Sequence, residues 1–214
     1  MKIAIFGGSF NPLHIGHANV AETLVKEHDF DKVIFVPTLI PPHKNFSNDV
    51  SAKMRFEMLK DFCAGEKNFE ASDCEIVRGG VSYTIDTVNF FLEKYKNELT
   101  EKPALVMGIE QATEFEKWKS ADEIARLTNI FIARRKKESK KTERKFQNTN
   151  TGAYRGDLYE SEKPFAFPHT IMENEMIALS STNIRERIAQ KKSWRYLVPE
   201  RVFKYIVKNK LYEL

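Results

Sequence analysis

Short apolar runs rich in β-branched residues alternate with amphipathic stretches along this chain, and the alternation limits the possible folds more than any other feature. The runs with strand character are residues 2–6 (KIAIF), 32–36 (KVIFV), 104–107 (ALVM) and 129–133 (NIFIA). Strands separated by helices pair in parallel, and a parallel sheet is covered on both faces. We therefore expect a Rossmann-like, doubly wound α/β fold with a mostly parallel sheet and helices on both faces.

Helical periodicity fills the intervals between these strands and the end of the chain. The predicted helices span residues 16–28, 51–63, 84–99, 120–127, 182–190 and 199–208. Ligands of such sheets bind beyond the carboxyl ends of the strands. The functional residues should therefore directly follow the predicted strands.

The periodic pattern is lost between residues 135 and 168, where polar residues predominate and Gly and Pro interrupt the chain. We expect residues 1–214 to form one domain with a mobile basic insertion at about 135–168. Residues 134–145 hold eight basic and two acidic side chains, a charge of +6, so the rest of this +4 chain carries −2. The run has no interleaved aromatic residues for base stacking, so a solvated loop is favoured over a nucleic-acid site.

The sequence predicts neither a membrane protein nor a secreted one. No apolar run reaches the roughly 18 residues of a membrane span, and Met1-Lys2 leads directly into the first predicted strand. The two cysteines, Cys63 and Cys74, lack CxxC partners, so buried free thiols are expected. The expected protein is cytoplasmic, with no membrane partner.

The loop after the first strand, residues 7–17 (GGSFNPLHIGH), has the composition of a phosphate site. Gly7 and Gly8 allow a ligand to approach the backbone closely, and the amides and dipole of the next helix favour an anion. His14 and His17 are spaced i, i+3, which places both imidazoles on one helical face. The loop is neither GxGxxG nor GxxxxGK[ST], so dehydrogenase and P-loop sites lose their main support.

The histidine pair could also bind a metal, and a second helix start near residue 181 could also bind phosphate. HxxH spacing also occurs in metal sites, but the remaining histidines and the cysteines offer no third ligand by spacing, and no protein-bound metal is predicted. Ser181 and Thr182 precede the helix at 183–190, with Arg185 one turn in, and this second helix start is suited to phosphate. Structural capping by Ser181 or Thr182 is the alternative, and both interpretations are compatible.

Several motifs together resemble a known family. GGSFNPLHIGH resembles the signature of the HxGH nucleotidyltransferase superfamily, and the full set, which spans nearly the whole chain, resembles bacterial nicotinate-nucleotide adenylyltransferases. The further motifs are Pro41-Pro42-His43-Lys44, residues 82–87 (SYTIDT), Gly108-Ile109-Glu110 followed by Trp118, and residues 180–185 (SSTNIR).

The resemblance implies transfer of AMP from ATP to nicotinate mononucleotide, with release of pyrophosphate and Mg²⁺ bound mainly by substrate and water. It implies catalytic roles for His14, His17 and Arg185. The implied ATP-binding residues are Gly7, Gly8, Ser9, Phe10, Gly16, Gly108, Glu110, Ser181 and Thr182. The implied nicotinate-nucleotide-binding residues are His43, Lys44, Tyr83, Thr84 and Trp118.

The chain departs from the family pattern at Glu110, where the family usually has aspartate, and at Ser9 and Asn11, which replace threonine and aspartate. Two alternative functions stay open from the sequence. One is adenylyl transfer to nicotinamide mononucleotide or another phosphate ester, and the other is a non-catalytic nucleotide- or anion-binding module. The oligomeric state is open as well, with a homo-oligomer among the options.

Overall fold

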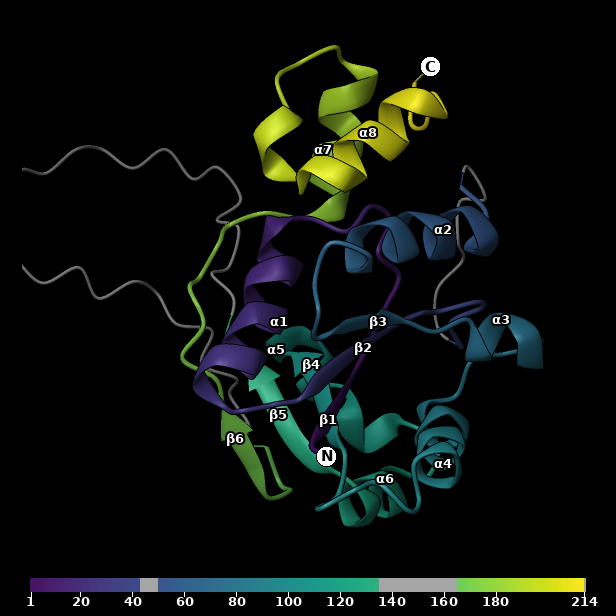
Figure 1. Cartoon of the computed structure of the whole chain (residues 1–214), viewed down its shortest axis with the longest axis vertical. Helices are drawn as coiled ribbons and strands as arrows, with labels where there is room; N and C mark the ends of the chain where they lie inside the picture. Colours follow the sequence, from purple (N-terminus) through teal and green to yellow (C-terminus); the bar gives the residue numbers. More distant parts are fainter. Residues whose placement is uncertain (43–49, 135–164, 214) are drawn as a thin grey trace, which may run out of the picture.

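The computed structural model describes residues 1–42, 50–134 and 165–213. Within these ranges a single sheet of parallel strands has the order β3-β2-β1-β4-β5-β6 (Figure 1). This order is that of a doubly wound Rossmann-like sheet, so the predicted fold class is confirmed. The strands are β1 (Ile3–Gly8), β2 (Lys32–Pro37), β3 (Phe69–Ala71), β4 (Ala104–Gly108), β5 (Asn129–Ala133) and β6 (His169–Ile171).

The four predicted strands are present, and the two edge strands were missed. β3 and β6 have three residues each, too few for a period-2 pattern to be recognised. β1, β2 and β4 extend beyond their apolar runs to Gly8, Pro37 and Gly108, respectively. These end residues have low strand propensity, yet they pair with the neighbouring strand, as Gly8 does with Pro37.

The predicted helices are present with small shifts at their ends, and two short ones, α3 and α5, were not predicted. The helix predicted to reach residue 99 ends at Lys94, because the backbone of Tyr95 leaves the helical conformation, with φ −112° and ψ 16°. The helices are α1 (Ile15–Glu27), α2 (Ala52–Cys63), α3 (Cys74–Arg78), α4 (Thr84–Lys94), α5 (Ile109–Ala112), α6 (Ala121–Leu127), α7 (Ser181–Ala189) and α8 (Glu200–Lys208), with 3-10 turns η1 (Phe115–Lys117) and η2 (Arg195–Leu197).

Alternating side chains of the sheet build a core on each face. Ala4 and Phe6 of β1 pack with α1, α2, α7 and α8, whereas Ile3 and Ile5 pack with α3 and α4. The C-terminal helices α7 and α8 lie next to α1 and α2 at one end of the molecule (Figure 1). This arrangement brings the end of the chain to the carboxyl end of β1.

Three sequence expectations outside the sheet can be placed. Cys63 and Cys74 are free and buried, as predicted, and burial raises the pKa of the Cys63 thiol to about 12. Residues 135–164 of the expected insertion lie outside the described residues, but Phe165 and Phe167 contact Phe115 of the core. None of the described helices is both long enough and apolar enough to cross a bilayer.

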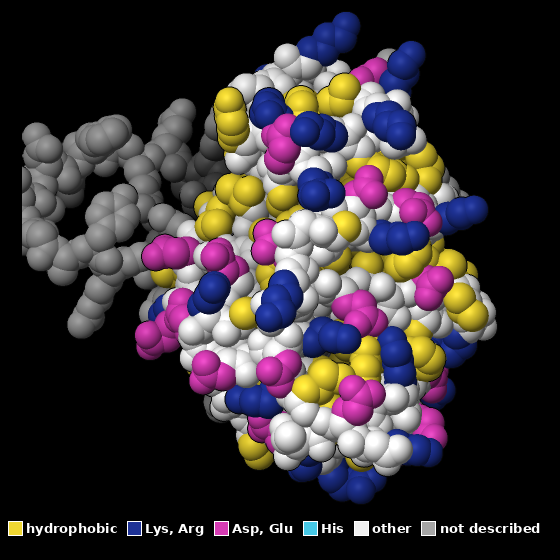
Figure 2. Space-filling model, in the orientation of Figure 1, with side chains coloured by type: hydrophobic (Ala, Val, Ile, Leu, Met, Phe, Trp, Pro, Cys, Tyr) yellow, Lys and Arg dark blue, Asp and Glu magenta, His cyan; other side chains and the backbone are white. Residues whose placement is uncertain are grey.

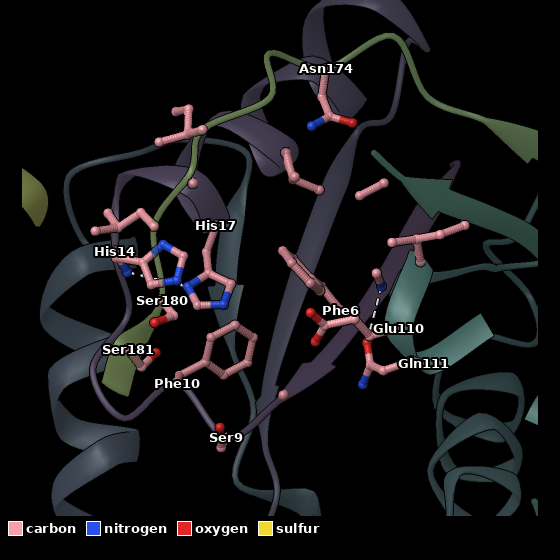
Figure 3. A pocket seen from close by; sticks show the side chains of 18 of the residues that line it. Phe6, Ser9, Phe10, His14, His17, Glu110, Gln111, Asn174, Ser180 and Ser181 are labelled. Carbon is pink, nitrogen blue, oxygen red and sulfur yellow. Dashed lines mark hydrogen bonds between the residues drawn. The ribbon is translucent and has the colours of Figure 1, made fainter. Parts of the chain in front are cut away.

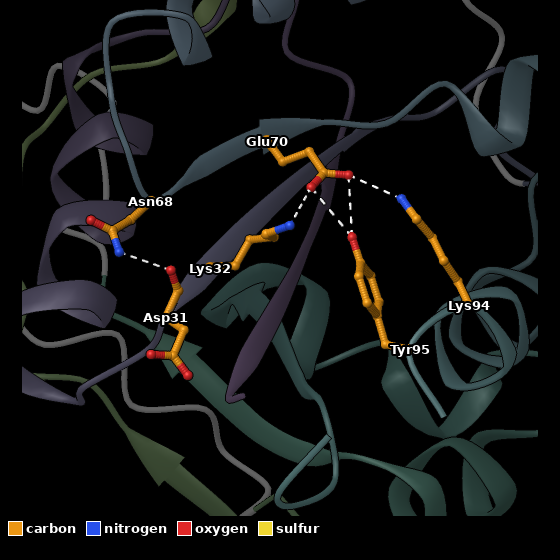
Figure 4. A network of polar contacts seen from close by, with 6 residues as sticks. All are labelled: Asp31, Lys32, Asn68, Glu70, Lys94 and Tyr95. Atoms are coloured by element: carbon orange, nitrogen blue, oxygen red, sulfur yellow. Dashed lines mark hydrogen bonds and ion pairs between the residues drawn. The ribbon is translucent and has the colours of Figure 1, made fainter. Parts of the chain in front are cut away.

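A cluster of charges joins the edge strand β3 to its neighbours (Figure 4). The Glu70 carboxylate accepts hydrogen bonds from Lys32 Nζ at 2.7 Å, Lys94 Nζ at 3.1 Å and the Tyr95 hydroxyl at 3.3 Å. Burial by itself raises the pKa of Glu70, but the two lysines outweigh it and the net pKa is lowered. Burial likewise opposes the charge of both lysines, and their pKa values are nevertheless raised by Glu70 and Tyr95.

Glu70→Gln is expected to lower the free energy of unfolding by about 1 kcal/mol at pH 7, because it removes the ion pairs with Lys32 and Lys94. The effect is small because solvent partly screens these ion pairs. A carboxylate with a lowered folded-state pKa stabilises the protein above its unfolded pKa of roughly 4.3, and this contribution is lost as the pH falls through the folded-state value. Urea unfolding of both proteins over an acidic pH series should therefore show the difference shrinking towards low pH. A difference that is constant with pH would contradict this electrostatic role.

Candidate active site

A cavity of about 530 Å³ lies at the carboxyl ends of β1 and β4. The chain runs from β1 outward to β2 and β3, and then from β4 outward to β5 and β6, so the strand order reverses between β1 and β4. Such a reversal is where doubly wound folds bind ligands. The cavity wall includes the end of β1, both histidines, the start of α5, the segment after β6 and the start of α7.

The two glycines that end β1 have different local requirements. A Cβ on Gly8 would lie 3.1 Å from the Phe10 ring, which is buried against Phe6 and His17, so the packing of that ring excludes a side chain. A Cβ on Gly7 would meet nothing within 4 Å, and Gly7 lines the cavity. Phe10 has a φ of +44°, a left-handed backbone conformation that is uncommon for a residue other than glycine.

His14 and His17 stand together on the cavity wall (Figure 3). Their rings are stacked with centroids 3.7 Å apart, and His14 caps the start of α1. The His14 backbone N–H donates to Nδ1 of His17 at 3.2 Å. Since Nδ1 accepts, the neutral His17 ring carries its proton on Nε2, where it is a donor.

The start of α7 is attached to the loop after β1. The capping residue is Ser180, whose hydroxyl accepts from the Asn183 N–H at 3.2 Å, so the alternative of capping by Ser181 or Thr182 is corrected. Both residues lie in the first turn, which frees the Ser181 hydroxyl to donate to the Pro12 carbonyl at 2.8 Å. Two helix starts separated by more than 160 residues thus face one cavity.

Arg185 links the same two segments. Its Nη1 donates to the Asn11 carbonyl at 2.8 Å and its Nη2 to the Thr182 hydroxyl at 3.1 Å. The side chain lines the cavity. Its guanidinium therefore holds the loop in place and contributes positive charge to the cavity wall.

The opposite side of the cavity is formed by the end of β4 and the start of α5. Figure 3 shows Glu110 and Gln111 across the cavity from the histidines. The Gln111 side-chain oxygen accepts from the Gly108 N–H at 3.0 Å, and the Glu110 side chain is exposed. The Glu110 carboxylate is therefore in a position to meet a ligand from the side opposite His17.

Residues after β5 and β6 also line the cavity and were not predicted. Asn174 is buried, and its side chain accepts from the Arg134 N–H at 2.9 Å and donates to the Arg134 carbonyl at 3.0 Å. This amide thus joins the end of β5 to the segment after β6, and Arg134 and Glu175 line the cavity beside it. No sequence signal identified Asn174, because β6 itself was not recognised.

The three mononucleotide candidates within the described residues, Tyr83, Thr84 and Trp118, do not line this cavity. Tyr83 caps α4, Thr84 is its first residue and Trp118 follows η1. Tyr83 and Trp118 are half-buried against the core cluster that includes Met107, one residue before the cavity-lining Gly108. His43 and Lys44 lie outside the described residues. The cavity accordingly unites every predicted ATP-binding and catalytic residue, whereas Tyr83, Thr84 and Trp118, the mononucleotide candidates that the structure describes, do not line it.

Gly16→Ala is expected to lower the turnover number of the adenylyl transfer that the motifs imply by about tenfold, because that reaction depends on precise placement of the reacting groups. The new Cβ would lie 3.1 Å from the His14 ring and displace it from its stack on His17. The loss of stability should be small, because the helix preference for alanine over glycine offsets part of the cost of moving the His14 ring. The control is Gly65→Ala, whose Cβ would meet only the flexible Arg201 side chain and lies away from the cavity. Equal rates for Gly16→Ala and Gly65→Ala would contradict a precise requirement for His14.

The fold and this site define a nucleotidyltransferase of the HxGH class. The model of the cytidylyltransferase-like family matches residues 5–187, and the chain belongs to that family. Within it, the chain is 36% identical over 212 residues to a "probable nicotinate-nucleotide adenylyltransferase" of Borrelia garinii subspecies bavariensis, covering 99% of this chain and 95% of the relative. A relative of the same name from Caldicellulosiruptor saccharolyticus is also 36% identical, over the full length of both chains.

Solved structures agree on the fold. The chain is similar to Plasmodium falciparum nicotinic acid mononucleotide adenylyltransferase complexed with NaAD, with a TM-score of 0.72, 15% identity and coverage of 99% of this chain and 97% of that one. The family model and the full-length relatives confirm the family resemblance inferred from the motifs.

Proposed function

We propose that this protein is a nicotinate-nucleotide adenylyltransferase of NAD biosynthesis. It transfers AMP from ATP to nicotinate mononucleotide and yields nicotinate adenine dinucleotide and pyrophosphate. The observation that carries the proposal is the junction of two helix starts on one cavity, made by Ser181 on Pro12 and Arg185 on Asn11, each at 2.8 Å. Full-length relatives that bear this name support the same activity.

The triphosphate of ATP lies between the starts of α1 and α7. Backbone N–H groups at helix starts bind phosphate oxygens, and both helix dipoles favour the negative charge there. His17 donates from Nε2, the His14 ring stacks on it, and Arg185 holds the Asn11 carbonyl of the adjoining loop. Gly7, Gly8, Ser9, Phe10 and Gly16 form the floor, Ser181 and Thr182 lie opposite, and Gly108 and Glu110 meet the adenosine.

The reaction is an in-line displacement at phosphorus. A 5′-phosphate oxygen of nicotinate mononucleotide forms a bond to the α-phosphorus, while the bond from that phosphorus to the α,β-bridging oxygen breaks. Pyrophosphate leaves with the electron pair of the broken bond. No protein nucleophile is needed, so the protein acts by positioning both phosphates and stabilising the charge that develops on the leaving group. His17 and Arg185 supply that stabilisation.

Nicotinate mononucleotide binds beside the cavity, towards α4 and η1. The N–H groups of Tyr83 and Thr84, at the start of α4, donate to the pyridine carboxylate, and Trp118 offers a ring face to the cationic pyridine. His43 and Lys44 meet the 5′-phosphate of this substrate. The common packing of Tyr83 and Trp118 near the end of β4 supports this location.

Mg²⁺ accompanies ATP in the proposed reaction. The described part of the chain contains no group of three or more His, Cys, Asp or Glu side chains arranged for a metal. Mg²⁺ commonly keeps its waters and binds substrate phosphates with few protein ligands, so it would be held mainly by the substrate and water. When bound with ATP, the ion would neutralise phosphate charge, while His17, Arg185 and the N–H groups at the two helix starts would orient the phosphates.

We also propose that residues 1–214 form one nucleotidyltransferase domain with the basic insertion at about 135–168, and that the enzyme is cytoplasmic. Lys and Arg side chains are interspersed with Asp and Glu on the face shown in Figure 2, so the described residues of this face offer no basic patch for nucleic acid.

Incubation of the purified protein with ATP, Mg²⁺ and nicotinate mononucleotide should give pyrophosphate and the dinucleotide in equal amounts. Nicotinamide mononucleotide in the same assay should have a kcat/KM lower by about tenfold or more, because N–H donors pair with a carboxylate better than with a carboxamide. A folded protein that binds ATP but forms no dinucleotide from either acceptor would refute the proposal. A preference for the amide would transfer it to the nicotinamide alternative.

A further inference from the structure

Arg55 of α2 is the largest of the side chains that the described structure buries fully, with 1% of its surface exposed. Burial lowers the pKa of its guanidinium, which reflects the cost of removing this charge from water. Such a group is retained only where polar partners compensate it.

The guanidinium donates to two backbone carbonyls in different loops. Nη1 donates to the Ser9 carbonyl and Nη2 to the Thr38 carbonyl, both at 2.7 Å. Ser9 directly follows β1, and Thr38 directly follows the neighbouring strand β2. The Thr38 N–H also donates to the Gly8 carbonyl at 2.9 Å, so the two loops leave the sheet as one unit.

The bond to Ser9 determines the direction of the next amide. In a planar trans peptide the N–H points opposite to the carbonyl, so the Phe10 N–H is turned away from Arg55. Ser9 and Phe10 both line the cavity, whereas no residue of α2 does. Thr38 is the first residue of the segment that leads to Pro41-Pro42-His43-Lys44. In the proposed function, His43 and Lys44 of that motif bind the 5′-phosphate of nicotinate mononucleotide.

We propose that Arg55 is a positioning residue for adenylyl transfer, whose two bonds to Ser9 and Thr38 set the spacing of the two substrate loops and aim the Phe10 N–H at the α-phosphate. The proposal rests on the proposed function. It assigns Arg55 no contact with substrate. Only arginine has the rigid fork that spans both carbonyls, whereas a lysine ammonium reaches one point.

The test compares Arg55→Lys and Arg55→Met with the parent protein in the dinucleotide-forming assay, well below their unfolding temperatures. Both variants should lower kcat about 10- to 100-fold, because a small misplacement of the reacting groups is costly. The KM for ATP should change less than kcat, since the rest of the triphosphate site is intact. Arg55→Lys should be the more stable variant and still fail to restore kcat.

Met58→Ala is the matched control, because Met58 is a fully buried residue of the same helix and touches neither carbonyl. It should lose stability and keep the parental kcat. Folded Arg55 variants with a parental kcat would overturn the proposal, as would a loss in kcat that Met58→Ala shares in proportion to its destabilisation.

If neither Arg55 variant folds, a crystal structure of the parent protein with a non-hydrolysable ATP analogue tests the proposal instead. A Phe10 N–H bonded to the α-phosphate supports the proposal, and one that faces elsewhere overturns it. Activity of the parent protein distinguishes this outcome from a failure of the proposed function.

Discussion

His17→Ala should lower kcat by about 10²- to 10³-fold, the usual effect of removing one preorganised donor from developing charge. The His14 N–H fixes His17 Nδ1 as an acceptor and leaves Nε2–H as the donor in the cavity. Alanine removes this donor and the ring that stacks on His14. Steady-state kinetics with ATP and nicotinate mononucleotide measure the loss, and circular dichroism checks the fold.

His28→Ala is the control for His17. His28 follows the last residue of α1, and its ring packs on Phe131, away from the cavity. Its replacement should change kcat less than twofold. If His17→Ala kept nearly the parental rate, or if both histidine variants lost activity equally, His17 would have no special role at the triphosphate.

Arg185→Met is expected to lower kcat/KM for ATP by about 10²-fold, because it removes both a cavity charge and the bond that holds the Asn11 carbonyl. Arg185→Lys should recover only part of the loss, since a single ammonium does not reach Asn11 and Thr182 together. The measurement is initial rate against ATP concentration at saturating mononucleotide.

Arg187→Met, on the same helix, is the matched control. Its guanidinium bonds the Asn183 side chain and the Ser193 carbonyl, and it does not line the cavity. It should lose some stability and keep kcat/KM. Parental kinetics for Arg185→Met would show that α7 contributes nothing to ATP binding through this residue.

The parts of the fold that the sequence predicted are those with long periodic patterns. Helices α1, α2 and α8 were located to within two residues, and the strand runs gave the centre of the sheet. β3 and β6 escaped because three residues define no period, and pairing with an existing sheet edge decides their conformation. Gly8 and Gly108 belong to strands only because neighbouring strands pair with them.

Residues of the candidate site also fall into those that a local sequence pattern marks and those that it does not. Residues within local motifs, such as His17 and Ser181, were predicted, whereas residues that act through tertiary contacts were not. Tyr212 is an example, since its hydroxyl donates to the Asn11 side chain at 2.7 Å across 201 positions of sequence. Burial raises the pKa of Tyr212, so the hydroxyl keeps the proton that it donates. Arg55 likewise acts across 46 positions, and no local pattern marks either residue.

A crystal structure of the protein with Mg²⁺ and a non-hydrolysable ATP analogue would show whether one nucleoside triphosphate lies between the starts of α1 and α7. We expect phosphate oxygens within hydrogen-bonding distance of His17 Nε2 and of backbone N–H groups at Ser181 and Thr182. An analogue bound outside this cavity, or one whose phosphates contact neither helix start, would contradict it.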